Sequence, residues 1–256
     1  MLDVDLSWWM PTYRRIAEML GLSEEEDRKA AGLMADLASG KAVEPHQLEE
    51  LLAGGPVLVA WNGPNLERDL STIAWSVGRV DFPVLAADGA AMTTYSLLGR
   101  VPDAIVSDLD GRNAVTLRLA EMGAVPVIHA HGDNVPALQK WVPRLPTLLP
   151  TTQVEPVGPV RNFGGFTDGD RAAFLAHAAG ANSILLAGVD LTSSSPLDVL
   201  RGKDLGFKRA KLGVAAWMIG LLARDLGARV YVLPTARGLE SSGAEVVEDP
   251  SEVLPR

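Results

Sequence analysis

Short apolar runs alternate with helical segments from Pro56 almost to the end of the chain, and this repeat constrains the fold most. Six runs have the character of buried strands: PVLVAW (56–61), FPVLAADGA (82–90), DAIVSDLDG (103–111), AVPVIHAHGDN (124–134), SILLAGVDL (183–191) and RVYVLPTA (229–236). Helical candidates lie at 90–98, 112–122, 134–141, 169–179 and 208–226, and the proline-rich stretch 143–160 is expected to be an irregular connection. The alternation predicts a mostly parallel sheet covered on both faces, a Rossmann-like three-layer α/β sandwich.

A region of different character precedes this repeat. Residues 7–52 read as entirely helical, and within them Ser23 and Glu26 have the spacing of a capping box. Nothing in this region resembles a catalytic cluster. The sequence therefore predicts a small helical N-terminal domain over 1–54 and an α/β domain over 55–256.

Composition narrows the classes of function. The chain of 256 residues carries a net charge of −9, which disfavours a nucleic-acid partner, and it has no cysteine for thiolate catalysis or a Cys-based metal site. The first 20 residues do not read as a signal peptide, and no run of 18 apolar residues could span a membrane. We expect a soluble, cytoplasmic protein. The apolar segment 212–223 could form a homo-oligomer interface or belong to the core.

Acidic residues follow two consecutive predicted strands. Asp108 and Asp110 are two residues apart, so on an extended backbone both carboxylates leave the same face. Asp133 holds the corresponding place after the next strand. Carboxylates gathered at one sheet edge suit a hard cation, usually Mg²⁺ carrying phosphate oxygens. The three aspartates are therefore candidate metal ligands, whereas an Asp-Gly turn would need only one of the first two.

Two other strand ends carry candidate ligand contacts. Asp88 and Gly89 could let a backbone turn approach a nucleotide, or Asp88 could cap the following helix. His129 and His131 alternate onto one strand face, and without a third zinc-type ligand they favour supporting hydrogen bonds or phosphate contact. The P-loop and GxGxxG signatures are absent, so a P-loop kinase and an ordinary NAD enzyme are both disfavoured.

A glycine-rich loop, NFGGFTDGDRA, spans residues 162–172. Asn162 and the neighbouring phenylalanines could contact a flat heterocycle, and Gly165 would allow close backbone approach. Thr167 or Asp168 could instead cap the next helix.

Two lysines lie further along the chain, in the segment GKDLGFKRAKL. Lys208 and Lys211 are three residues apart on a predicted helix, so both ammonium groups can reach one site. They are candidate phosphate contacts, although exposed lysines are more often simply solvated.

Taken together, these motifs resemble the archaeal 6-hydroxymethyl-7,8-dihydropterin pyrophosphokinases, which are distantly similar to thiamin pyrophosphokinases. The resemblance covers about half the chain and is carried, in the family's order, by DGA (88–90), PDAIVSDLDG (102–111), HAHGDN (129–134), NFGGFTDGDRA (162–172), AGVDL (187–191) and FKRAKL (207–212). It implies an archaeal enzyme of methanopterin or folate biosynthesis. Such an enzyme uses Mg²⁺ and ATP to transfer a pyrophosphoryl group to the pterin's hydroxymethyl oxygen, releasing AMP.

The resemblance also implies roles for individual residues. Asp108, Asp110 and Asp133 would hold Mg²⁺ across the phosphates, and Lys208 and Lys211 would stabilise charge on the moving group. Contacts to nucleotide or pterin would come from Asp88, Gly89, His131, Asn134, Asn162, Gly165, Thr167 and Asp168. Two alternatives stay open: a pyrophosphokinase for another alcohol such as thiamin, and a non-catalytic nucleotide-binding module.

Overall fold

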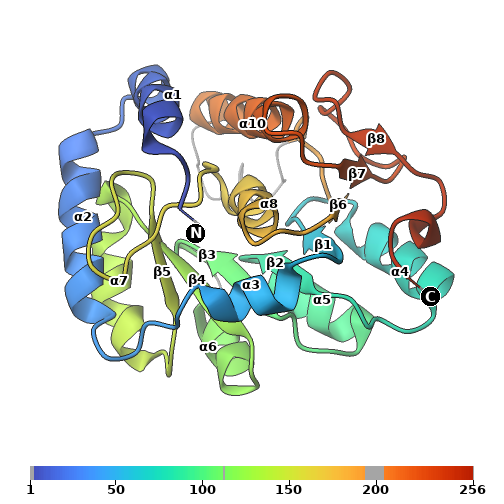
Figure 1. Cartoon of the computed structure of the whole chain (residues 1–256), viewed down its shortest axis with the longest axis horizontal. Helices are drawn as coiled ribbons and strands as arrows, with labels where there is room; N and C mark the ends of the chain where they lie inside the picture. The colour runs from blue at the N-terminus through green and yellow to red at the C-terminus, as the bar shows by residue number, and fades with distance from the viewer. Residues whose placement is uncertain (1–2, 112, 194–204, 256) are drawn as a thin grey trace.

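The computed structural model describes residues 3–111, 113–193 and 205–255 (Figure 1). Within them the strands form a single sheet of eight, in the order β5-β4-β3-β2-β1-β6-β7-β8, and every neighbouring pair is parallel. The strands are β1 (Pro56–Ala60), β2 (Val84–Ala87), β3 (Ala104–Ser107), β4 (Val125–Ala130), β5 (Leu149–Thr152), β6 (Ser183–Ala187), β7 (Val230–Val232) and β8 (Glu245–Val246). The predicted parallel sheet is confirmed.

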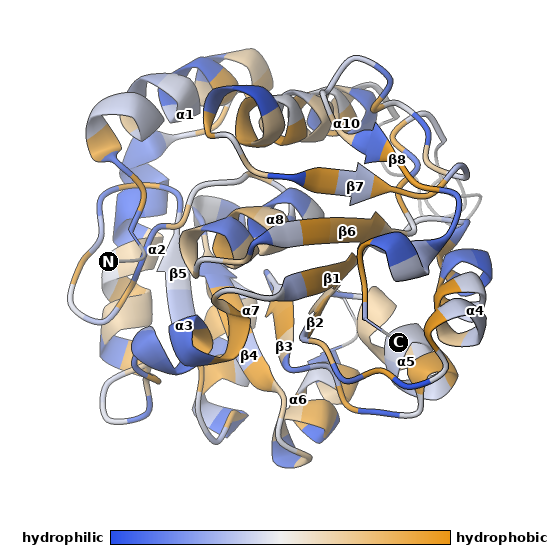
Figure 2. Ribbon diagram, turned by 45° about the vertical axis from the view of Figure 1, so that its right-hand side comes forward, coloured by the Kyte–Doolittle hydropathy of each residue, from blue (hydrophilic) through white to orange (hydrophobic). Residues whose placement is uncertain are grey.

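Helices cover both faces of this sheet, as the periodicity predicts. Alternate residues of β1 face opposite layers: Val57 and Val59 pack with helices α1, α8 and α10, whereas Leu58 packs with helix α4. The first layer contains α1 (Leu6–Leu20), α8 (Asp168–Ala178) and α10 (Leu205–Gly220), and the second contains α4 (Leu66–Val77), α5 (Ala90–Leu98), α6 (Asn113–Glu121) and α7 (Val135–Trp141). Because both faces are buried, β1 and β6 are mostly hydrophobic (Figure 2). The three-layer sandwich is confirmed.

The N-terminal helices share a core with the sheet. Trp9, Tyr13 and Ile16 of α1 belong to the same apolar cluster as the inward residues of the strands. Helix α2 (Glu24–Leu37) packs against β4, β5 and α7, and α3 (His46–Leu52) adds two leucines to the shared core. The domain boundary after residue 54 stays a prediction.

The expected secondary structure was wrong at residues 38–45, and it lacked the two edge strands, β5 and β8. Residues 38–45 are not helical, because Val43 donates its N–H to Leu148 O over 2.8 Å and so ties this connector to the sheet region. The stretch 143–160 contains β5, which pairs with β4. Pro150 lies in β5, and a proline in the sequence argues against a strand. It is tolerated there because β5 is an edge strand. Among the described residues, no helix is long and apolar enough to cross a membrane.

Candidate active site

The carboxyl ends of β2, β3 and β4 meet the N-terminus of α8 at one edge of the sheet. Asp88 follows β2, Asp108 and Asp110 follow β3, and Asp168 is the first residue of α8. The pKa of Asp168 is raised well above its ordinary value by burial and by the negative charges of Asp108, Asp88 and Asp110. Asp88, Asp108 and Asp110 therefore lie within electrostatic reach of Asp168, and their charges disfavour the ionised form of Asp168.

The loop after β3 is a tight turn. Strand β3 ends at Ser107, and Leu109 has a φ of 62°, so the backbone is not extended through 108–110 as the same-face argument assumed. Asp108 Oδ1 accepts the N–H of Asp110 over 3.0 Å, and Ser107 Oγ accepts that of Leu109 over 3.0 Å. Asp108 thus has a turn role in addition to its place in the cluster. Its side chain is 18% exposed, and Asp110 is exposed beside it.

His131 connects the loop after β4 to Asp108. Its Nδ1 accepts the N–H of Asp133 over 3.3 Å, which leaves Nε2 as the ring nitrogen that can donate a proton. That Nε2 lies 3.6 Å from Asp108 Oδ2. Burial by itself would raise the pKa of Asp108, but the interactions with His131 and with the N–H of Asp110 lower it below the ordinary value. Asp108 is therefore held as a carboxylate.

Asn134 has a different role from the predicted ligand contact. It is 4% exposed, and its Oδ1 accepts the N–H of His131 over 3.0 Å. Its Nδ2 donates to the carbonyl oxygens of Asp108 and His129, each over 2.7 Å. These bonds use both amide hydrogens, so Asn134 ties the ends of β3 and β4 together and positions the residues around it.

His129 supports the site from the core. It is 1% exposed, and its Nδ1 lies 3.2 Å from Thr151 Oγ1. The rings of His129 and His131 stack with centroids 6.0 Å apart, as expected for two residues on one strand face. Burial and the positive charge of Arg171 lower the pKa of His129 well below its ordinary value. His129 is a neutral, supporting residue.

Asp88 does not cap the helix that follows it. Gly89 takes the N-cap position of α5, whereas the Asp88 carboxylate accepts from Ser107 Oγ over 2.9 Å. The close approach at Gly89 is to Asn62, because a Cβ at Gly89 would lie 2.5 Å from Asn62 Nδ2. Sequence analysis gave Asn62 no role. It follows β1 as Asp88 follows β2, and the rule that polar residues after strands share one edge could have found it.

The glycine-rich loop is built for packing. Asn162 is fully buried; its Nδ2 donates to Val154 O over 2.8 Å, and its Oδ1 accepts the N–H of Gly164 over 2.9 Å. Gly165 has a φ of 78°, and a Cβ there would lie 2.5 Å from Arg171 Cα. The predicted contacts of Asn162 and Gly165 with a heterocycle are therefore replaced by contacts within the protein.

The start of α8 places its charged residues at the site. Thr167 is the N-cap residue, and its N–H donates to Asp170 Oδ1 over 2.6 Å, which confirms the capping interpretation. Arg171, which sequence analysis overlooked, is 3% exposed and lies 3.3 Å from Asp168 through Nη1. Its Nη2 donates to Phe166 O over 2.7 Å. A buried guanidinium thus partly offsets the carboxylate charge.

Lys211 extends from α10 toward this loop. Its Nζ lies 5.9 Å from the ring centroid of Phe166 and 5.6 Å from that of Phe207, and its charge contributes to the lowered pKa of His129. Lys208 lies three residues earlier on α10 and is partly exposed. The preceding residues 202–204 of the lysine motif lie outside the described residues.

Within the part of the chain that the structure describes, the acidic side chains at this edge do not form a closed set of three metal ligands. Across residues 3–111, 113–193 and 205–255, no three Asp, Glu, His or Cys side chains come together as a metal-ligand group, and Asp133 is exposed. The predicted set of three aspartates is thus not preformed. Mg²⁺ commonly takes one or two protein carboxylates and completes its shell with phosphate oxygens and water. The donor chemistry of Asp108 and Asp110 fits that kind of site.

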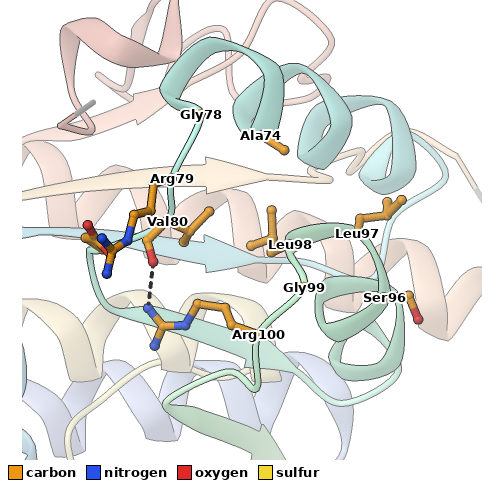
Figure 3. Close-up of a pocket in the computed structure, with 10 residues that line it drawn as sticks. Ala74, Gly78, Arg79, Val80, Ser96, Leu97, Leu98, Gly99 and Arg100 are labelled. Carbon is orange, nitrogen blue, oxygen red and sulfur yellow. Dashed lines mark hydrogen bonds and ion pairs between the residues drawn. The ribbon is translucent and has the colours of Figure 1, made fainter.

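A hollow of about 420 Å³ lies at the other edge of the sheet, between the ends of α4 and α5 (Figure 3). Arg100 crosses it and donates from Nη1 to Val80 O over 3.2 Å. Because its loops lead into the amino ends of β2 and β3, it is remote from the acidic residues.

Comparison with known proteins identifies a family model and relatives of similar sequence. A family model described as "6-hydroxymethylpterin diphosphokinase MptE-like" matches residues 33–195. This range includes the acidic edge of the sheet, which is formed by Asp88, Asp108, Asp110 and Asp168. Relatives named 6-hydroxymethyl-7,8-dihydropterin pyrophosphokinase occur in three archaea. The Pyrococcus furiosus protein is 44% identical over 72% of this chain and 77% of its own. The Methanothermobacter thermautotrophicus protein is 36% identical over 89% of this chain and 99% of its own length. The Methanocaldococcus jannaschii protein is 30% identical over 73% of this chain and 80% of its own length.

Similarity to solved structures is weaker. An α-2,3/8-sialyltransferase variant aligns with a TM-score of 0.45 and 16% identity, covering 76% of this chain and 87% of its own. The sequence relationships are decisive, because the family model spans more than half of the chain and the relatives are covered over most of their length. The chain belongs to the MptE-like family of 6-hydroxymethylpterin diphosphokinases.

Proposed function

We propose that this protein transfers the pyrophosphoryl group of ATP to the hydroxymethyl oxygen of 6-hydroxymethyl-7,8-dihydropterin. The observation that carries the proposal is the acidic edge of Asp88, Asp108, Asp110 and Asp168 in a chain related to enzymes of that name. The pterin oxygen bonds to the β-phosphorus, and the bond from that phosphorus to the α–β bridging oxygen breaks. The products are the pterin diphosphate, AMP and the proton of the hydroxyl group.

In this proposal Asp108 and Asp110 hold Mg²⁺ on the nucleotide phosphates, with Asp133 at the exposed rim. The lowered pKa of Asp108, which keeps it a carboxylate, and the exposed position of Asp110 beside it support this assignment. Bound there, Mg²⁺ would neutralise phosphate charge, which is the main requirement of phosphoryl-type transfer. The protein itself contributes alignment, because the turn after β3 and the ring of His131 fix the direction of the Asp108 carboxylate.

Lys211 stabilises charge that develops on the transferred group in this proposal, and Lys208 lies on the preceding turn of α10. The position of Lys211 beside Phe166 and its electrostatic effect on His129 support its assignment. No strong base is required, since a loose transition state leaves little need to deprotonate the alcohol early. The pterin diphosphate would serve methanopterin or folate synthesis in the cytoplasm.

The test is incubation of the purified protein with Mg²⁺, ATP and the hydroxymethyl pterin, followed by chromatographic analysis of nucleotides and pterins. Pterin-dependent AMP with an equal amount of pterin diphosphate is the expected result. ADP in place of AMP would overturn the pyrophosphoryl mode. Turnover with thiamin but not with the pterin would overturn the acceptor, and omission of Mg²⁺ is expected to stop the reaction.

A further inference from the structure

The turn that carries His131 is attached to an N-terminal helix through a buried carboxylate. Asp27 of α2 is 4% exposed, and its Oδ1 accepts the N–H of Gly132 over 2.7 Å. Its Oδ2 accepts from Tyr13 Oη over 2.5 Å and from Gln153 Nε2 over 2.6 Å. One carboxylate thus joins α1, α2, the segment after β5 and the turn after β4.

The contact at Gly132 is steric as well as polar. A Cβ on Gly132 would lie 2.7 Å from Glu26 Cβ, so α2 rests directly on the turn. Gly132 stands between His131, whose Nε2 faces Asp108, and Asp133, whose N–H donates to the His131 ring. A displacement of the turn relative to α2 would therefore move the His131 ring away from Asp108.

We propose that Asp27 is a positioning residue for the reaction, fixing the His131–Asp133 turn, and through it the Asp108 carboxylate, from the N-terminal helices. This inference rests on the proposed function. The three donors to Asp27 divide into two kinds: Tyr13 and Gln153 belong to the scaffold, whereas only Gly132 belongs to the site. Removal of the Tyr13 hydroxyl therefore perturbs the same buried carboxylate while leaving its bond to Gly132.

The test compares Asp27→Ala with the matched control Tyr13→Phe in the full-length protein, below the unfolding temperature of both. The first readout is steady-state turnover with Mg²⁺, ATP and the pterin. Asp27→Ala is expected to lower kcat by about 10- to 100-fold, the usual loss when a partner supporting a metal-binding group is removed, with a smaller change in KM. Tyr13→Phe is expected to keep a kcat near that of the parent, even where its stability is reduced.

The second readout does not depend on activity. His131–Gly132 is the only His-Gly step in the sequence, so protein labelled with carbonyl-¹³C histidine and ¹⁵N glycine gives one HNCO peak, from the Gly132 amide. Hydrogen exchange of that amide is expected to be slow in the parent and in Tyr13→Phe, and fast in folded Asp27→Ala. Equal protection in all three proteins, or parental kcat in folded Asp27→Ala, would overturn the proposal.

Two outcomes separate this inference from the proposed function. A parent protein without pterin-dependent AMP formation would refute the function, and with it the role of Asp27 in that reaction. An active parent with an unaffected Asp27→Ala variant would refute the inference alone. If Asp27→Ala does not fold, Gly132→Ala tests the same contact from the turn, because its methyl group would push against Glu26. Parental kcat in that variant would also overturn the proposal.

Discussion

His131 Nε2 lies 3.6 Å from Asp108 Oδ2, and this contact joins the loops that follow two neighbouring strands, β3 and β4. The other ring nitrogen of His131, Nδ1, accepts the N–H of Asp133. The backbone N–H of His131 donates to Asn134 Oδ1. Asp108 is thus directed by groups that need no contact with a substrate. Both oxygens of Asp108 thus have a neighbour in the protein, the N–H of Asp110 at Oδ1 and the ring of His131 at Oδ2.

Asp110→Asn is expected to lower turnover by about 100-fold or more, because it removes one of the two charges proposed to hold Mg²⁺ on ATP. The residue is exposed, so the free energy of unfolding should change by less than about 0.5 kcal/mol. Asp81→Asn is the matched control, since Asp81 is exposed just before β2 and pairs with Arg79 away from the site. Coupled assay of AMP release checks the prediction, and near-normal turnover of Asp110→Asn would refute the metal assignment.

Lys211→Met is expected to reduce kcat by about 100-fold, because the ammonium group is proposed to stabilise developing phosphate charge. Arg209→Gln removes one positive charge from the exposed side of the same helix and serves as the control. Single-turnover measurement of AMP formation distinguishes a slower chemical step from weaker binding. Equal kcat values for the two variants would exclude a specific role for Lys211.

His129 should make stability depend on pH. Its pKa is lowered by burial and by Arg171, so the folded state resists a proton that the unfolded chain accepts near its ordinary pKa of 6.5. The contribution of His129 to the free energy of unfolding is therefore fully present above pH 6.5. It decreases as the pH falls below 6.5, by about 1.4 kcal/mol per pH unit. Urea unfolding between pH 7.5 and 5 measures it. His129→Gln should flatten the curve, and parallel curves for the two proteins would contradict the prediction.

Gly165→Ala and Gly21→Ala form a pair that separates backbone strain from collision. Both glycines have positive φ, 78° and 68°, but a Cβ at Gly21 meets nothing within 4 Å, whereas one at Gly165 would lie 2.5 Å from Arg171 Cα. Gly21→Ala should lower the free energy of unfolding only by the strain of alanine in a left-handed conformation, about 1–2 kcal/mol. Gly165→Ala should cost clearly more and displace the start of α8. Denaturant unfolding gives both values, and equal losses would show that the loop relaxes freely.

Most strands and helices of the sheet region could be predicted from the sequence. Alternating apolar runs and helical periodicity report on the backbone over a few residues, so α5 was predicted at its observed bounds of 90–98. Strand β5 was missed, because Pro146 and Pro150 are typical of an irregular connection. Only its pairing with β4 identifies this segment as a strand. Local pattern also placed Asp88 and Asp108 at strand ends, where ligands of parallel sheets bind.

The roles of individual site residues were less accessible. Asn134 and Asn162 looked like ligand contacts because they stand in polar, glycine-rich motifs, yet both bond inside the protein. A side chain's partner is set by whatever packs against it in space. For a buried amide that partner is a backbone carbonyl that local spacing does not reveal.

The sequence by itself determined the layered α/β class, the parallel strands and the chemical identity of the acidic edge, because these follow from periodicity and residue type along short segments. Only the tertiary structure decided that β4 lies beside β3, which brings His131 to Asp108, and that Asp27 reaches Gly132 across 105 residues. Contacts of that separation depend on strand order and on helices packing over the sheet edge. They are set by burial of the whole chain, which local propensity does not encode.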